Sequence, residues 1–390
     1  MKRMQKYNVF LLIFVLILQF FMLYDCNNCK KCKAVSITNL EYTSKAEAMA
    51  TIEATTGKLL YSKDENKKLP MASTTKILTA IIAIENCKDL NQKHEIKKEM
   101  TGIEGSSIYL KSGEHLSVRE LLYGLMLRSG NDSAVAIAII VGGSVENFLK
   151  LMNQKCLDLG LADTHIETVN GLHSEGHYTT ALELAKITAY ALKNKIFAEI
   201  VATKFAKIDN ELGNKDKIRY LKNKNKLLNM IEGADGVKTG YTTKSGRCFV
   251  GSATRNGIQI ISVVLNCSNW FEESAYYIEK AFQEYTNIDA FKAGIIIQKE
   301  IYVDNKKTQI IPILLKNDIR ITINKENISK IYAKLEVKNN IQTPHIETDS
   351  IGELRVYVEN DLIFSEKVYT INIDKDSNIG DYVKKIIDAF

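Results

Sequence analysis

The segment that follows Lys76 has no charged side chain before Glu85 and is almost entirely apolar. A helix that is apolar all round is buried inside a domain rather than exposed on its surface. The segment Ser73–Glu85 therefore predicts a buried helix that other elements must cover. With 390 residues, the chain is long enough for two or three domains, one of which encloses this helix.

Strand patterns occur on both sides of this helix in the sequence, with a helical block between them. Strands are predicted at residues 46–55, 58–61, 236–242, 247–255 and 258–266, and helices at residues 118–127, 132–141, 181–192 and 271–285. Asn256-Gly257 predicts a two-residue hairpin turn between the last two strands. Strands at both ends and helices between them predict an α+β domain, in which helices pack on an antiparallel sheet. We expect this domain at residues 37–288.

The pattern changes after about residue 290. Apolar and polar residues alternate around Ile321 and again around Val356, and Asn360-Asp361 predicts a turn. This period of two predicts a small all-β domain at residues 289–376. Residues 377–390 return to a helical period. Their apolar face comprises Ile379, Tyr382, Val383, Ile386, Ile387 and Phe390.

The N-terminus has the pattern of an export signal. Residues 2–6 are largely basic, and the fifteen residues Val9–Leu23 are apolar apart from Gln19. A spanning helix needs about 20 apolar residues. Residues 1–36 are therefore predicted to be a secretory signal peptide, with an uncleaved N-terminal anchor as the alternative. In either case the folded part is secreted or lies at the outer face of the cytoplasmic membrane.

Charge excludes one class of partner. The formal net charge is +6, and residues 1–33 alone account for +5 of it. A protein that binds nucleic acid carries its basic excess on the folded part. This chain carries it in the leader, so we expect no nucleic-acid partner.

The cysteines and histidines give no strong metal signal. Cys26, Cys29 and Cys32 have a spacing that metal or iron–sulfur ligands can share, but a fourth ligand is missing nearby and cleavage would remove all three. His173 and His177 are four residues apart, but the glycines around them make a shared helical face improbable, so a loop along the floor of a cleft is expected. The other cysteines are expected in the core without a disulfide; they are Cys87, Cys156, Cys248 and Cys267. We expect no metal and no cofactor.

Three short motifs follow one another in an order that carries chemistry. Ser73-Thr74-Thr75-Lys76 opens the buried helix, Ser129-Gly130-Asn131 lies in a turn between two helices, and Lys238-Thr239-Gly240 lies on a strand. Each alone has a structural explanation, as a helix start, a polar turn or a strand end. Together and in this order they resemble the S-x-x-K, S-D-N and K-T-G set of penicillin-binding proteins and serine β-lactamases, with Gly130 as the middle residue of the second motif.

The residue types suit acyl transfer. Ser73 and Lys76 share a helix face, and burial next to Lys238 would lower the pKa of Lys76 until it can accept the serine proton. Ser129 would pass a proton to the leaving amine, and Asn131 would orient Lys76 and the substrate amide. Lys238 and Thr239 suit a terminal carboxylate. Gly240 would let a substrate backbone approach the strand.

The residues around these motifs resemble one family more closely. Leu69–Lys76, Leu127–Asp132 and Gly233–Thr242 look like the corresponding segments of the D-alanyl-D-alanine carboxypeptidases, the low-molecular-mass penicillin-binding proteins, and the resemblance covers roughly residues 45–285. It implies a penicillin-recognising transpeptidase-like fold and an oxyanion hole from the backbone N–H groups of Ser73 and Tyr241. Members often carry a small β domain and end in a membrane-associating amphipathic helix, so residues 377–390 either bind the membrane surface or pack on the β domain.

One departure from the family is visible. Some members place an arginine just after the strand that ends near Asn266, where this chain has Cys267, Ser268 and Asn269. The carboxylate partners beyond Lys238 and Thr239 are therefore open.

The resemblance implies a function and leaves two alternatives. The chain would remove the terminal D-alanine from peptidoglycan stem peptides, and β-lactam antibiotics would inhibit it by acylating Ser73. A serine β-lactamase is the nearest alternative, but it commonly has one domain and a Glu-x-x-Leu-Asn loop that this sequence lacks. A non-enzymatic penicillin- or wall-binding module is the other alternative, and the retained nucleophile and base argue against it.

Overall fold

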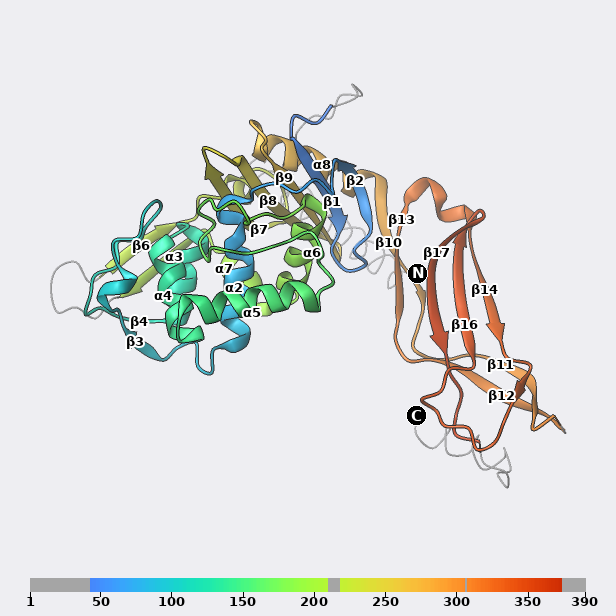
Figure 1. Cartoon of the computed structure of the whole chain (residues 1–390). Helices are drawn as coiled ribbons and strands as arrows, with labels where there is room; N and C mark the ends of the chain where they lie inside the picture. Colours follow the sequence, from blue (N-terminus) through green and yellow to red (C-terminus); the bar gives the residue numbers. More distant parts are fainter. Residues whose placement is uncertain (1–42, 210–217, 306, 374–390) are drawn as a thin grey trace, which may run out of the picture.

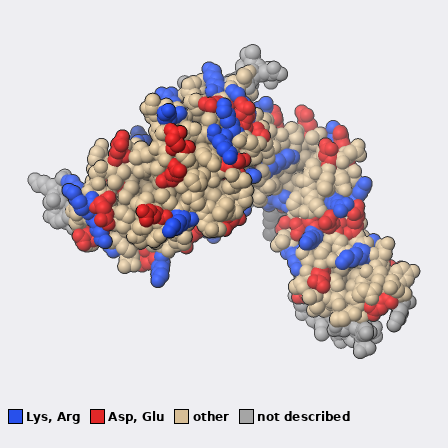
Figure 2. Space-filling model, viewed as in Figure 1, with Lys and Arg blue, Asp and Glu red and all other residues tan. Residues whose placement is uncertain are grey.

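The structure, a computed structural model, describes residues 43–209, 218–305 and 307–373. The predicted leader, the cluster of Cys26, Cys29 and Cys32, and the C-terminal segment 377–390 lie outside these residues. The described chain forms two bodies, a larger α+β domain and an elongated β domain connected to it through β10 (Tyr285–Phe291) (Figure 1). Figure 2 shows acidic and basic side chains interspersed over the visible face of the larger domain.

The centre of the larger domain is a five-stranded antiparallel sheet in the order β2-β1-β9-β8-β7. Its strands are β1 (Ala48–Glu53), β2 (Leu59–Lys63), β7 (Ala234–Thr242), β8 (Gly246–Arg255) and β9 (Ile258–Leu265). The predicted hairpin turn is confirmed, because Arg255 pairs with Ile258 and both Asn256 and Gly257 have positive φ. The sheet joins segments from the two ends of the domain sequence, as the α+β prediction requires.

Helices cover both faces of this sheet. One face packs against α8 (Trp270–Glu284), around Phe249, Phe271 and Ile278. The other faces α2 (Lys76–Asn86), α6 (Ala181–Leu192) and α7 (Lys195–Ala202). Beyond these lie α3 (Val118–Leu127), α4 (Asn131–Gly142) and α5 (Val145–Asp158), together with the short hairpins β3 (Lys93–Glu95)/β4 (His115–Ser117) and β5 (Phe205–Asp209)/β6 (Ile218–Lys222).

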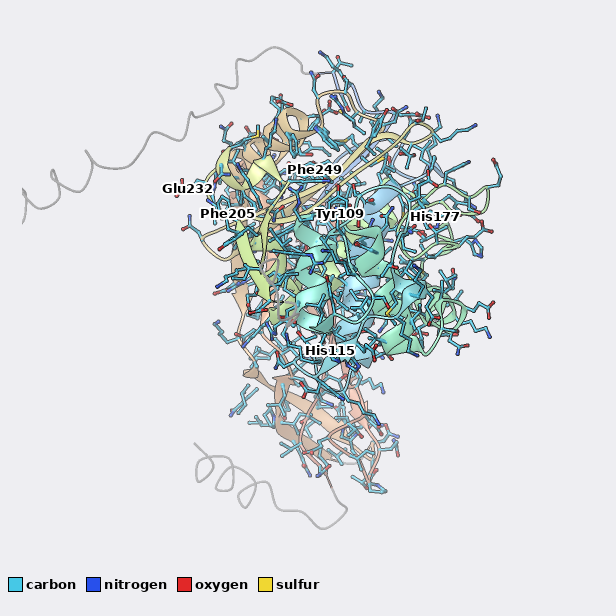
Figure 3. The ribbon with its side chains drawn as sticks, turned by 90° about the vertical axis from the view of Figure 1, so that its left-hand side faces the viewer. Tyr109, His115, His177, Phe205, Glu232 and Phe249 are labelled. Atoms are coloured by element: carbon cyan, nitrogen blue, oxygen red, sulfur yellow. The ribbon has the colours of Figure 1, made fainter. Side chains whose placement is uncertain are left out.

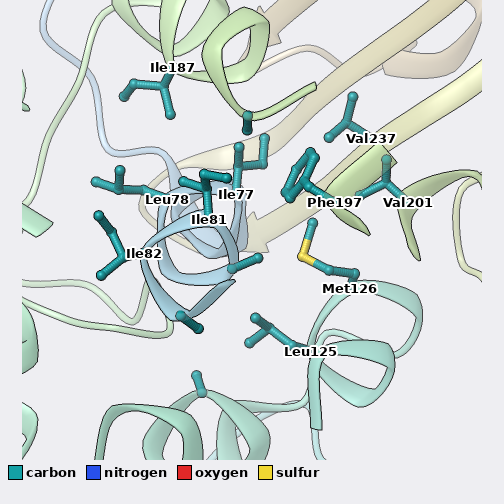
Figure 4. Packing of buried hydrophobic residues seen from close by; sticks show 14 of the residues in the cluster. Ile77, Leu78, Ile81, Ile82, Leu125, Met126, Ile187, Phe197, Val201 and Val237 are labelled. Carbon is teal, nitrogen blue, oxygen red and sulfur yellow. The ribbon is translucent and has the colours of Figure 1, made fainter. Parts of the chain in front are cut away.

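The buried helix predicted from the apolar run is α2. Every side chain from Lys76 to Ile84 is buried, and apolar residues of α3, α6, α7 and β7 surround it (Figure 4). The prediction was wrong about where the helix begins, because Ser73 lies in a separate 3-10 turn, η1 (Ala72–Thr75). The hydroxyls of Thr74 and Thr75 donate to the carbonyls of Met71 and Ala72, which holds this turn apart from the α-helix.

The second domain is all-β, as predicted. It contains β10 paired with β13 (Ile319–Asn324), a sheet of β11 (Gly294–Val303), β12 (Lys307–Leu315) and β15 (Asn340–Ile341), and a sheet of β14 (Ile331–Val337), β16 (Gly352–Val358) and β17 (Asp361–Val368). Alternating residues such as Ile321 and Val356 form its core. The border expected at residues 288/289 falls inside β10, so we propose that the domains divide between α8 and β10.

The predicted turn at Asn360-Asp361 was wrong by one residue. Val358 pairs with Asp361, so the turn consists of Glu359 and Asn360, and Glu359 has a φ of 54°. A shift in register between Val356 and Tyr357 moves the partner residues along β17, which draws Asp361 into the strand.

The described residues contain no single helix with the length and hydropathy to span a membrane. Only α4 and α5 taken together pass by length and composition, and they are bent by 87° at the break between them.

Candidate active site

Ser73, Lys76 and Asn131 meet in one cluster. The Nζ atom of Lys76 lies 2.9 Å from Ser73 Oγ, 2.6 Å from Asn131 Oδ1 and 2.7 Å from the carbonyl oxygen of Asn170. Asn131 and Asn170 present carbonyl oxygens, which can only accept hydrogen bonds. A neutral lysine has two N–H groups and one lone pair. As an ammonium, Lys76 donates to all three oxygens; as a neutral amine it can keep its two N–H groups on the carbonyl oxygens, which leaves its lone pair for the proton of Ser73.

Electrostatics favours this neutral form. Burial holds the pKa of Lys76 well below its usual value, and the charges of Lys238 and Lys224 lower it further. The carboxylate of Asp132 acts in the opposite direction but does not reverse the shift. The lowered pKa raises the neutral fraction of Lys76, which suits it to accept the proton of Ser73.

The backbone before Ser73 and at Ser129 is unusual. Ala72 has a φ of 47° and Ser129 a φ of 65°, which are left-handed conformations that residues other than glycine seldom adopt. Such conformations concentrate at functional sites. They place Ser73 and Ser129 on the walls of the same cavity.

The loop before α3 fixes the orientation of Asn131. Asn131 Nδ2 donates to the Glu104 carbonyl at 2.5 Å, which turns Oδ1 toward Lys76. The buried carboxylate of Asp132 accepts from the backbone N–H groups of Ile108 and Leu110 and from the Ser107 hydroxyl, and so holds this loop in place. Tyr109, at the exposed tip of the loop, is 79% exposed (Figure 3).

The third motif lies on β7, the edge strand of the sheet. An added Cβ on Gly240 would lie 3.0 Å from the backbone nitrogen of Ser73, so only a small residue fits there. Thr239, Gly240 and Tyr241 line the same cavity as Ser73. Lys238 does not line it, because its side chain is only 2% exposed and its Nζ donates to the Thr239 carbonyl. Burial, and then the charge of Lys224, lower the pKa of Lys238 to about 7.

The loop with His173 and His177 contacts the nucleophile turn through His177, and neither histidine lines the cavity at Ser73. His177 Nδ1 accepts from the Glu167 backbone N–H, so its Nε2 carries the proton and donates to Thr75 Oγ1 at 2.8 Å. Burial lowers the pKa of His177 to about 4, so the ring is neutral. Within the described residues, no group of three or more His, Cys, Asp or Glu side chains could hold a metal ion.

Gly171 brings the loop before His173 against the nucleophile turn. Its φ is 81°, and an added Cβ would lie 2.0 Å from the Ala72 carbonyl oxygen. This close approach places the Asn170 carbonyl within hydrogen-bond distance of Lys76. No sequence pattern pointed to Asn170, because it contributes a backbone atom.

The cavity at the cluster has a volume of about 270 Å³. It is lined by Ser73, Ser106, Ser129, Lys224, Thr239, Gly240, Tyr241 and Trp270. Five of these belong to the three motifs or adjoin them, whereas Ser106, Lys224 and Trp270 come from elsewhere in the chain. None of the lining residues is a carboxylic acid. The four described cysteines are free, and Cys156, Cys248 and Cys267 are buried as expected, whereas Cys87 is only partly buried, so its predicted place in the core was wrong.

Comparisons with known proteins agree with this geometry. A family model described as D-alanyl-D-alanine carboxypeptidase matches residues 33–269, and one described as the C-terminal domain of penicillin-binding protein 5 matches residues 285–375. The D-alanyl-D-alanine carboxypeptidase DacF of Bacillus subtilis is 31% identical over 84% of this chain and 85% of its own length. The D-alanyl-D-alanine carboxypeptidase of a Streptomyces species (strain K15) is 36% identical over 54% of this chain and 77% of its own length.

Solved structures show the same two-domain arrangement. Penicillin-binding protein 5 from Haemophilus influenzae matches with a TM-score of 0.76 and 26% identity, over 86% of this chain and 99% of that protein. With two family models that together cover both domains, this chain belongs to the D-alanyl-D-alanine carboxypeptidase family, the low-molecular-mass penicillin-binding proteins.

Proposed function

We propose that this protein is a serine-type carboxypeptidase that removes the terminal D-alanine from peptidoglycan stem peptides through an acyl-enzyme on Ser73. The observation that carries the proposal is the contact of 2.9 Å between Ser73 Oγ and a buried Lys76 whose other two partners only accept hydrogen bonds. Its family membership supports this activity over that of a serine β-lactamase.

In the acylation step, Ser73 Oγ attacks the carbonyl carbon of the penultimate D-alanine while its proton passes to Lys76 Nζ. The C–N bond to the last D-alanine then breaks, and an ester to Ser73 remains. The leaving amine needs a proton. We propose that Ser129 transfers this proton to the amine from the protonated Lys76. Asn131 holds Lys76 through its Oδ1. Free D-alanine leaves.

The edge of β7 offers a place for the peptide. An edge strand has unpaired backbone groups, to which an extended peptide can add as a further strand. Gly240 keeps this edge close to Ser73. We assign the oxyanion hole to the backbone N–H groups of Ser73 and Tyr241. Thr239 offers its hydroxyl to the terminal carboxylate, and Lys238 lies buried behind it.

The peptide adduct and the penicillin adduct should differ in the deacylation step. Lys76 can activate a water molecule that hydrolyses the ester and releases the shortened peptide. In a penicillin adduct the cleaved ring stays attached and occupies the place that D-alanine vacates. The cavity wall has no carboxylic acid to activate water from another direction, so the penicillin adduct should persist. β-Lactam antibiotics would therefore act as inhibitors.

Two assays on the full chain test the proposed function. Incubation with a pentapeptide ending in D-Ala-D-Ala should release D-alanine, whereas incubation with penicillin should give a stable adduct of one molecule per chain and little hydrolysed penicillin. Rapid penicillin turnover without D-alanine release would indicate a β-lactamase. An adduct without release of D-alanine from any peptide would indicate a binding module.

We also propose that the folded part acts outside the cytoplasm, secreted or held at the outer face of the cytoplasmic membrane. The basic start of the chain and the apolar run Val9–Leu23 support this location. Fusion of residues 1–36 to a reporter that is active only after export should give activity, and the same fusion with charged residues in the apolar run should not. Retention of the first fusion in the cytoplasm would contradict the proposed location.

A further inference from the structure

The structure separates the charge of the third motif from the substrate side of the cleft. Lys238 is 2% exposed and donates to the carbonyl of the next residue. It lines neither of the two cavities on either side of Thr239. A buried, partly neutral amine is a weak partner for a carboxylate that arrives from solvent. The basic side chains that do line these cavities come from outside the third motif.

A second cavity opens beside the cleft. Its volume is about 590 Å³, and Lys224, Thr239 and Trp270 line both cavities, so the two adjoin at these residues. Its other lining residues are Lys226, Arg247, Ser268, Asn269, Phe271 and Glu272. Three cations thus face one carboxylate, which makes this a positively charged extension of the cleft.

Arg247 is the cation that the fold holds most firmly in this cavity. It lies at the start of β8, where it pairs with Tyr241 of β7. Its Nη1 donates to the Ser268 carbonyl at 3.0 Å, and its guanidinium carbon lies 5.8 Å from the centre of the Trp270 ring. These contacts use one N–H of the five that a guanidinium carries. Within the described residues, Arg247 makes no ion pair, although its side chain is exposed.

The chemistry of the substrate places its carboxylate near this cavity. In a peptide ending in D-Ala-D-Ala, three bonds connect the scissile carbonyl carbon to the terminal carboxylate carbon, with a summed length of about 4.3 Å. When the scissile carbon lies at Ser73, the carboxylate is therefore confined to the immediate surroundings of the cleft. Thr239, which lies on β7 one residue before Gly240, is one of the residues that line both this cleft and the cavity with Arg247.

We infer that Arg247, assisted by Lys224, binds the C-terminal carboxylate of the substrate through the cavity beyond Thr239. This inference rests on the proposed carboxypeptidase function and names the group that selects a free carboxylate. A guanidinium is planar and always charged, so it can hold both carboxylate oxygens at once. Lys224 Nζ already donates to Ser106 Oγ at 3.3 Å, which keeps its charge beside both cavities.

The test compares two substrates in Arg247→Gln. On a peptide ending in free D-Ala-D-Ala, kcat/KM should fall by about 10- to 100-fold, whereas on the same peptide with a C-terminal amide it should change less than about threefold. Arg247→Lys should recover part of the loss, because lysine keeps the positive charge but cannot hold both carboxylate oxygens in the planar way of a guanidinium. Lys244→Gln removes an equal charge from the exposed β7–β8 turn, which lines neither cavity, and should affect neither substrate.

Equal losses on the acid and the amide would overturn the inference, because Arg247 would then only position β7. No loss on either substrate would overturn it as well. If the wild-type protein releases no D-alanine, the proposed function fails, and a second readout still decides the role of Arg247. Acylation by benzylpenicillin, which carries a carboxylate, should slow in Arg247→Gln, and acylation by its methyl ester should not. An equal effect on both would exclude carboxylate binding.

Discussion

Replacing Ser73 by alanine should abolish both the penicillin adduct and D-alanine release. The variant removes the oxygen that forms the acyl bond, and nothing else in the cluster can take its place at 2.9 Å from Lys76. Loss of a nucleophile in serine hydrolases costs on the order of 10⁶-fold in kcat, so release should fall to the assay background. Mass spectrometry of the intact chain after mixing with penicillin, and D-alanine release from a pentapeptide, measure the two effects.

A neighbouring serine provides the matched control. Ser133 is buried near the site, and its hydroxyl has no hydrogen-bond partner within the described residues. Ser133→Ala should therefore form the adduct and release D-alanine as the wild type does. The Ser73→Ala variant should keep its fold, because Ser73 is only half-buried and lies in a short turn. An adduct that survives in Ser73→Ala, on Ser129 for example, would overturn the assignment of the nucleophile.

The fold was largely predictable because its elements carry strong local patterns. The bounds predicted for α3 and α6 are those found, and those of α4, β8 and β9 are within one residue of prediction. What local patterns could not supply is the strand order. β1 pairs with β9 across some two hundred residues of sequence, and the residue pattern of neither strand indicates which strand it pairs with. The start of α2 was missed because threonine hydroxyl contacts, which no periodicity reveals, divide the turn from the helix.

The candidate site was predictable to the extent that its side chains lie in short motifs. Ser73, Lys76 and Asn131 do lie together, but the carbonyl of Asn170 that completes the cluster is a backbone atom. Burial was the harder property to predict. The sequence pattern places Lys238 on a strand but does not show whether its side chain is exposed. In the structure η1 packs on β7, and the side chain of Lys238 is buried. Arg247 escaped notice because, in sequence, it is one cation among 52 basic side chains.

Replacing Lys76 should separate its role as a base from its charge. In Lys76→Met, a side chain of similar length fills the buried site without an amine, and acylation by penicillin should slow by about 10²- to 10⁴-fold. Lys76→Arg keeps a positive charge that cannot be neutralised, so it should be as slow. Thermal melting checks that each variant is folded, since the carbonyls of Asn131 and Asn170 lose a donor in Lys76→Met. Fast acylation in the arginine variant would mean that charge alone suffices.

The pH dependence tests the same role without altering Lys76. Only the neutral amine accepts the proton of Ser73, so the wild-type acylation rate should rise tenfold per pH unit below the pKa of Lys76 and level off above it. Burial, and then the charge of Lys238, hold that pKa well below 10.5. Because its own pKa is lowered to about 7, Lys238 carries its charge below pH 7, and it is in this range that its charge can lower the pKa of Lys76. In Lys238→Gln this charge is gone, the pKa of Lys76 rises, and the limb should move to higher pH. A limb that stays in place or moves to lower pH would show that Lys238 does not act on Lys76 through its charge.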